Sequence, residues 1–164
     1  MKKLIIASVF ILGMTVNSYA QEGLAVKAGL NNVSINVDAG GFFGASFSET
    51  GFYFGGSYTL PTNGELYIEP SVLISIVDNL TSLYIPVMGK YYVADQFNIQ
   101  AGPQINYLLE DVDSGAFGLD LGFGAGYDIS DEFFVEARYA FEILRDADGV
   151  NINTFTIGAG YRFL

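Results

Sequence analysis

The sequence predicts an all-β protein, an eight-stranded antiparallel up-and-down barrel, from three features. Segments of about ten residues alternate between apolar positions and polar or glycine positions, which is the side-chain period of a β-strand. Turn-forming residues separate several of these segments. The connections also alternate between short and longer ones, as in a meander whose two rims differ.

The region 117–143 shows this alternation most clearly. In 117–129 every second residue is apolar, and the residues between them are glycine or aspartate. The segment 133–143 repeats the pattern, and Ser130 and Asp131 form a short hairpin connection between the two. Each segment therefore has one wholly apolar face.

The remaining six predicted strands follow the same rule in chain order. They are residues 23–31, 51–60, 65–76, 82–93, 97–109 and 154–163. Residues 32–50 are rich in Gly, Asn and Ser with a mixed pattern, which predicts a long loop, with 42–47 as an alternative start of the next strand.

The other connections are predicted from their turn and loop residues. Tight turns are expected at 61–64 and 94–96, and loops at 77–81, 110–115 and 144–153. Pro70, Pro86 and Pro103 fall within predicted strands, where a missing N–H disfavours a ladder position. We expect a bulge or a later strand start at each proline.

Composition narrows the possible functions. The chain has 164 residues, enough for one domain, with no cysteine and no histidine. Disulfides, thiolate chemistry and imidazole ligands or bases are therefore excluded, and we expect no cofactor. A net charge of −11 argues against nucleic acid as a partner, because that needs a basic surface.

Residues 1–20 have the pattern of a secretory signal peptide. Lys2 and Lys3 precede an apolar run over 4–16, and Ser18-Tyr19-Ala20 provides small residues before Gln21. The run is too short for a membrane-spanning helix, which needs about 20 apolar residues. We expect cleavage, export, and a mature barrel domain over 21–164 with two fewer positive charges.

Charge separates the two faces of the predicted strands. The apolar parity has no charged residue, whereas the polar parity has four charges of each sign: Lys27, Glu69, Lys90, Asp120, Glu136, Arg138, Glu142 and Arg162. A confined interior requires such balance because an unpaired buried charge costs several kcal/mol. The polar face is therefore predicted to be the interior and the apolar face the outside.

Aromatic residues mark both ends of the apolar face. One rim has Tyr58, Tyr91, Phe97, Tyr127, Phe133, Tyr161 and Phe163, and the other has Phe52, Tyr107, Phe117, Phe141 and Phe155. Two such girdles around an apolar band are typical of a transmembrane β-barrel. The alternative is a soluble lipocalin-like barrel with its apolar residues inside.

Several stretches also resemble a known family. Four stretches, taken in order, resemble the small porin-family β-barrels of Gram-negative outer membranes, the PorT-like outer-membrane β-barrel domain. They are LTSLYIPVMGKYYV, FNIQAGPQINYLL, VEARYAF and FTIGAGYRFL. The resemblance covers the chain from about Gly23 onward and implies a location in outer-membrane lipid. "Porin" here describes architecture more than pore activity.

The resemblance also suggests how the barrel is assembled. The closing Tyr161-Arg162-Phe163 resembles the C-terminal signal that barrel-insertion machinery reads, although Leu164 follows the usual terminal aromatic. The resemblance thus implies that Tyr161 and Phe163 form the assembly signal.

The interior charges are the only chemically distinctive group. They could line a narrow ion path or fill the lumen as a plug. An eight-stranded barrel is just wide enough for side chains, which favours the plug. Its expected centre is Glu136, Arg138 and Glu142 with Arg162. The function is then structural, or an interaction through surface loops; the alternatives are a narrow porin or channel and the soluble ligand-binding barrel.

Metal-binding and enzymatic functions are not expected. Residues 111–115 and 146–149 resemble fragments of calcium loops but lack the downstream glutamate and are interpreted as turns. Outer-membrane barrels that act on lipid A or on peptides resemble one another in needing an active-site histidine, which this chain lacks.

Overall fold

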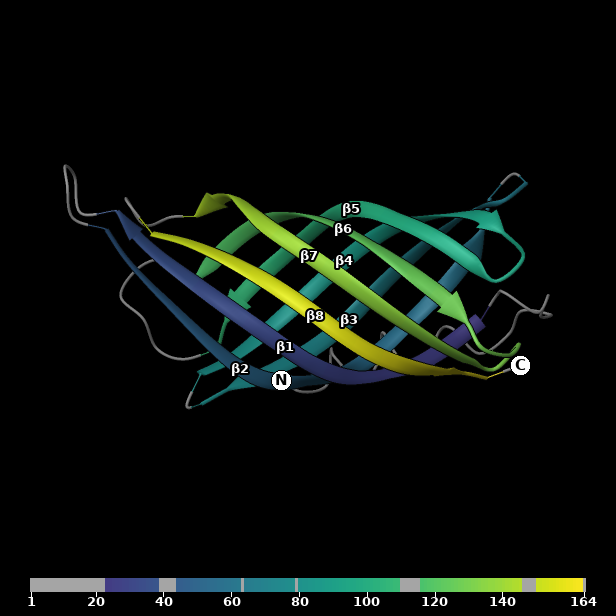
Figure 1. Cartoon of the computed structure of the whole chain (residues 1–164), viewed down its shortest axis with the longest axis horizontal. Coiled ribbons are helices and arrows are strands. Elements are labelled where there is room, and N and C mark those ends of the chain that lie inside the picture. Colours follow the sequence, from purple (N-terminus) through teal and green to yellow (C-terminus); the bar gives the residue numbers. More distant parts are fainter. Residues whose placement is uncertain are drawn as a thin grey trace, which may run out of the picture.

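Eight antiparallel strands make up the barrel in the computed structural model, which describes residues 23–38, 44–62, 64–78, 80–109, 116–145 and 150–163 (Figure 1). The strands are β1 (Gly23–Asp38), β2 (Gly44–Pro61), β3 (Leu66–Val77), β4 (Leu80–Ala94), β5 (Phe97–Leu108), β6 (Phe117–Asp128), β7 (Phe133–Arg145) and β8 (Val150–Arg162). The predicted fold class is confirmed.

The sheet closes on itself through its first and last strands. Each strand pairs with its sequence neighbours, and β8 pairs with β1, with Val26 opposite Tyr161 and Val37 opposite Val150. Closure removes the unpaired strand edges that an open sheet would present to lipid. An up-and-down barrel is therefore compatible with a bilayer.

The connections define two ends of the barrel. At the end that we call the turn end, strands are joined by 62–65, 95–96 and 129–132, and β1 begins and β8 ends there. At the opposite loop end they are joined by 39–43, 78–79, 109–116 and 146–149. Figure 1 shows the turn end on the right and the loop end, with the far ends of β1 and β2, on the left.

The apolar face of the strands points outward. Val26, Phe123 and Ile157 are about half exposed, whereas Lys27 and Glu136 on the opposite parity are buried. A soluble barrel would have the reverse arrangement, because its core excludes water from apolar groups. The outward apolar band is that of a barrel in lipid.

Aromatic side chains lie on the outside at both ends of this band. Phe97 pairs with Tyr127 near the turn end, and Tyr107 pairs with Phe117 near the loop end. All four side chains are exposed. Such rings favour the interface between hydrocarbon and headgroups, which fits the two predicted girdles.

The predicted loop over 32–50 is wrong, because most of it is strand. β1 continues to Asp38 and pairs in unbroken register with β2, which begins at Gly44. The alternation persists here but with opposite polarity: Asn32 and Ser34 share the outward parity, and Val33 and Ile35 the inward one. Outward polar residues suit a segment that extends beyond the lipid into water.

Two other loops are shorter than expected. Val77 pairs with Leu80 and Ile76 with Thr81, so strand pairing extends into the loop predicted at 77–81. Asp78 adopts a positive φ of 52°, which aspartate tolerates. β7 continues to Arg145 and β8 begins at Val150, which shortens the loop predicted at 144–153. The predicted loop at 110–115 and residues 42–43 lie outside the described residues.

The prolines do not produce the expected bulges. Pro70, Pro86 and Pro103 lie within β3, β4 and β5, and the pairing keeps one register on both sides of each. The register shifts instead at Tyr92/Ala94 and at Leu119/Asp120. A missing N–H thus leaves a local gap in hydrogen bonding without changing the number of residues between strands.

A search of the described residues for helices found none that is long and apolar enough to cross a membrane.

Candidate functional site

The eight charged residues singled out in the sequence all point into the barrel. Lys27, Glu69, Lys90, Asp120, Glu136, Arg138 and Arg162 are buried, and the Glu142 side chain is only 1 % exposed. They come from six of the eight strands, β1, β3, β4, β6, β7 and β8. The barrel interior thus gathers charges that lie far apart in sequence.

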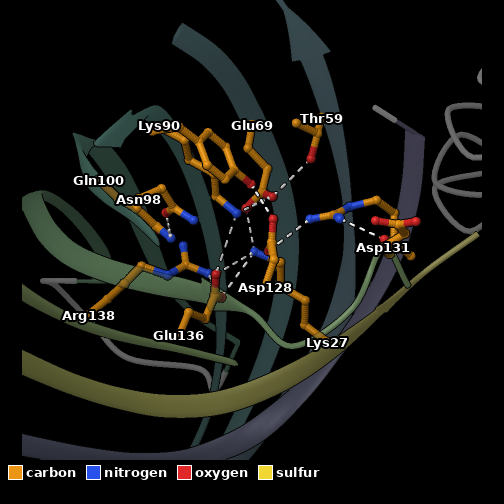
Figure 2. A network of polar contacts seen from close by, with 12 residues as sticks. Lys27, Thr59, Glu69, Lys90, Asn98, Gln100, Asp128, Asp131, Glu136 and Arg138 are labelled. Carbon is orange, nitrogen blue, oxygen red and sulfur yellow. Dashed lines mark hydrogen bonds and ion pairs between the residues drawn. The ribbon is translucent and has the colours of Figure 1, made fainter. Parts of the chain in front are cut away.

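Five of these side chains form one contiguous cluster, which we call the central cluster (Figure 2). The Lys27 ammonium forms ion pairs with Glu69 and, at 3.0 Å, with Glu136. Lys90 lies 2.6 Å from Glu69 and 3.7 Å from Glu136, and Arg138 pairs with Glu136. The central cluster therefore has three cations and two carboxylates.

Neighbouring groups complete the contacts of the cluster. The Thr59 hydroxyl donates a hydrogen bond of 3.1 Å to Glu69. The Phe134 ring lies against three cations, with centroid distances of 5.4 Å to Lys27, 5.2 Å to Lys90 and 5.1 Å to Arg162. Cation–π contacts of this kind help to offset the lost hydration of buried cations.

Glycines on β8 make room for the large interior rings. A Cβ at Gly160 would lie 2.2 Å from the Phe134 ring, and one at Gly158 would lie 2.3 Å from the Tyr53 hydroxyl. The inward-facing glycines of β8 therefore provide space that aromatic side chains from other strands occupy.

Glu142 and Arg162 do not belong to the centre, contrary to expectation. Glu142 pairs with Arg145 near the loop end and accepts a hydrogen bond of 2.8 Å from the Ile152 N–H. Arg162 pairs at 3.4 Å with Asp128 near the turn end. A strand rises about 3.3 Å per residue, so residues of one face separated by four to six positions lie at different heights.

The remaining predicted residue, Asp120, stands apart from the ion pairs. Its carboxylate accepts a hydrogen bond of 2.9 Å from Gln104. Asp128, by contrast, accepts a hydrogen bond of 2.7 Å from the Tyr92 hydroxyl in addition to its pairing with Arg162.

Two interior charges, Arg145 and Asp128, were not among the predicted site residues. Arg145 has the wrong parity for the interior, but the extra residue Ile143 at the β6–β7 register shift turns it inward. Asp128 has the interior parity at the end of a strand, which is a signal that could have placed it. Parity alone cannot detect a bulge.

With these two residues the interior charges balance. All five basic residues after residue 20 lie inside, together with five carboxylates, of which four form ion pairs with them and Asp120 does not. The sequence has 18 acidic residues, so thirteen are not matched by any base after residue 20. Those whose side chains are described are exposed: Glu49, Glu65, Asp78, Asp95, Asp131 and Glu132.

The lumen is closed to water at the level of the central cluster. A water-filled channel would leave the side chains that line it accessible, yet Lys27, Glu69, Lys90 and Glu136 are only 1–3 % exposed. Tyr53, Met88 and Phe134, equally buried, fill space beside them. The interior at this height is a packed layer of side chains.

No group of three or more carboxylates that could hold a metal ion occurs among the described residues. The aspartate-rich segments 111–115 and 146–149 lie outside that part of the chain. The interior carboxylates of the central cluster face cations of the chain itself, which occupy the positions that a metal would take.

The C-terminal aromatic residues lie on the outside of the turn end. The Tyr161 ring packs edge-on against Phe133 at 5.0 Å and against Phe163 at 5.2 Å. The Phe163 N–H donates a hydrogen bond of 2.8 Å to the carbonyl of Leu24, which joins the chain end to β1. Both predicted signal residues are therefore accessible from the lipid side.

Comparisons with known proteins agree with this geometry. The family described as outer membrane protein beta-barrel domain matches residues 5–163. A search of the curated proteins found no match.

Solved structures include several similar barrels. Neisserial surface protein A (NspA) is 15 % identical with a TM-score of 0.58, covering 86 % of this chain and 97 % of NspA. Ail of Yersinia pestis, solved with the heparin analogue sucrose octasulfate, is 18 % identical with a TM-score of 0.53, covering 87 % and 99 %. A de novo designed transmembrane β-barrel is 15 % identical with a TM-score of 0.54, covering 90 % and 100 %. At these identities the structures show a shared fold, and the family match over nearly the whole chain shows that this protein belongs to the outer-membrane β-barrel domain family.

Proposed function

We propose that this protein is a closed outer-membrane barrel whose loop end acts at the cell surface and whose lumen conducts nothing. One observation supports the proposal above all: the layer of buried, mutually paired charges at the central cluster, 1–3 % exposed, leaves no path for water. Its role is then to stabilise the membrane or to contact molecules at the cell surface.

Efflux from lipid vesicles tests this proposal. Refolded protein is inserted into vesicles loaded with a small solute such as glycine, and release is compared with that of protein-free vesicles. We expect equal release, because the packed layer blocks the lumen. Faster release in proportion to inserted protein would favour the competing function, a narrow channel.

The acidic surface limits the partners that we propose. The structure of Ail contains a polyanion, sucrose octasulfate. In this chain every basic residue after residue 20 is interior, so an anionic glycan would meet uncompensated carboxylates. We expect no heat on titration with sucrose octasulfate, and saturable binding would refute this part of the proposal.

Export and assembly complete the proposal. We infer that residues 1–20 are removed, and the intact mass of the protein from outer membranes, beginning at Gln21, tests this. The exposed Phe163 and the half-buried Tyr161 that packs against it support reading of the last strand by insertion machinery. Replacing both with alanine should reduce insertion in cells while leaving refolding in detergent possible.

The order of motifs in the sequence supports the PorT-like subtype within the family, with both chain ends in the periplasm. We propose no catalysis, because the sequence has neither histidine nor cysteine. Protease accessibility of the loop end on intact cells tests the orientation: cleavage there, and none at the turn end, is expected.

A further inference from the structure

An apolar pocket lies inside the barrel mouth at the loop end. Its volume is about 320 Å³, and its wall includes Val33 and Ile35 of β1, Val77 of β3 and Ile152 of β8. Ligand pockets in proteins begin at about 300 Å³, so this one suits a small molecule. It is separate from the central cluster, none of whose residues lines it.

The pocket results from the inverted polarity of the β1–β2 extension. On the outward side, the Asn32 amide donates a hydrogen bond of 3.0 Å to Thr50, and the Ser48 hydroxyl donates one of 2.8 Å to Asn32. This polar outer side suits water, so the apolar side chains Val33 and Ile35 turn inward. They gain no burial from lipid there, and a ligand in the mouth would cover them.

The charged groups at the pocket are carboxylates, and Ser82, Tyr84 and Asn106 contribute neutral polar groups. Glu49 and Asp78 contribute exposed carboxylates to its wall. Asn106, only 1 % exposed, also lines it, and its side-chain carbonyl oxygen has no hydrogen-bond partner among the described residues. A buried acceptor without a partner costs free energy that a donor on a ligand would recover.

We propose that this pocket binds a small apolar primary amine in its ammonium form. The apolar body lies against Val77 and Ile152, and the ammonium group pairs with the carboxylates of Glu49 and Asp78, with the free acceptor of Asn106 as an additional partner. No lysine or arginine lines the pocket in the described part of the chain, so no cation there would form an ion pair with an anionic ligand. The inference rests on the proposed function, since it gives the outward end a ligand.

Three ligands of matched shape test the charge preference. Phenethylamine, 2-phenylethanol and 3-phenylpropionate share the ring and differ in being cationic, neutral and anionic at neutral pH. Each is titrated calorimetrically into the barrel in phosphatidylcholine nanodiscs, with empty nanodiscs as the control for partition into lipid. We expect saturable binding of the amine, weaker binding of the alcohol and none of the carboxylate.

Variants separate charge from shape. Glu49→Gln with Asp78→Asn should weaken amine binding about tenfold and leave alcohol binding unchanged, because only the ion pairs are lost. The matched control, Glu65→Gln with Asp95→Asn at the turn end, should bind the amine like the wild type. Ile35→Phe should weaken binding of both the amine and the alcohol by filling the pocket.

The outcomes distinguish this inference from the proposed function. Equal binding of amine and carboxylate, no saturable amine binding, or full amine affinity in the double variant would each overturn the pocket proposal. Vesicle efflux tests the closed lumen independently. A leaking barrel that still binds the amine would refute the proposed function and keep the pocket, and a tight barrel without amine binding would do the reverse.

Discussion

Replacing Glu136 with glutamine tests the central cluster most sharply. The change keeps the size of the side chain and removes its charge. Glu136 pairs with Arg138 and lies 3.0 Å from Lys27 and 3.7 Å from Lys90. After Glu136→Gln, these three buried cations have Glu69 as their only carboxylate within the cluster.

The size of the effect follows from burial. Removing one partner of a buried ion pair leaves an uncompensated charge and costs about 3–5 kcal/mol. The cluster carries a charge of +1 with three cations and two carboxylates, and the substitution raises it to +2. We therefore expect the free energy of unfolding to fall by about 3 kcal/mol or more.

Removing a cation should cost less than removing a carboxylate. Lys27→Met leaves Lys90 and Arg138 with Glu69 and Glu136, so the cluster becomes neutral. The order of stability predicted is wild type, then Lys27→Met, then Glu136→Gln. Counting salt bridges alone would not predict this order, because both variants lose ion pairs of the central cluster.

The assay is urea unfolding of the refolded barrel in detergent or lipid, followed by far-UV circular dichroism because the chain has no tryptophan. Free energies are compared at equal m-values. Glu132→Gln, an exposed acid in the β6–β7 turn, is the matched control and should change stability by less than about 0.5 kcal/mol. If Glu136→Gln unfolds like Glu132→Gln, the ion pairs of the central cluster do not stabilise the barrel.

Two further predictions concern packing and the lipid face. Gly160→Ala should destabilise the barrel by about 1–3 kcal/mol, because the new methyl group would lie 2.2 Å from the Phe134 ring. Gly89→Ala is the control and should be tolerated, because its nearest contact is at 3.5 Å. Equal unfolding midpoints for the two variants would contradict this prediction. Ala101→Arg, in the middle of the outward apolar band, should lower the free energy of unfolding in a bilayer by about 2–4 kcal/mol, and Ala94→Arg at the turn end by about 0–1 kcal/mol. Equal losses of stability on unfolding from vesicles would show that the band does not lie in the hydrocarbon.

The fold could be predicted because the period-two pattern is strong wherever lipid lies on one side. Contact with lipid requires that the outward residues of a strand carry no charge, and burial in the interior requires that the inward charges balance. Each strand within the membrane therefore has two recognisable signals in the sequence. The extension of β1 and β2 was not predicted as strand because the described outward side chains there, such as Asn32 and Ser48, are polar. There the same alternation continues with the polar residues outside, which resembles a loop when only apolar-out strands are sought.

The sequence predicts which residues lie inside the barrel better than it predicts which of them contact one another. Parity along each strand selects the inward side chains, but their height depends on the stagger between strands, which the sequence pattern does not contain. Register places Arg162 six residues along β8 from Thr156, the partner of Arg138, and Glu142 lies four residues beyond Arg138 on β7 itself. Arg145 was missed because a single extra residue, Ile143, reverses the parity beyond it.

Single-channel conductance in planar bilayers tests the closed lumen most directly. Insertion is verified by recovering folded protein from the membrane, and a variant with Lys27, Arg138 and Phe134 replaced by alanine serves as the opened comparison. We predict a silent bilayer for the wild type and reproducible current steps for the variant, because only the variant lacks side chains that fill the lumen. Steady current steps from the wild-type barrel would contradict the account.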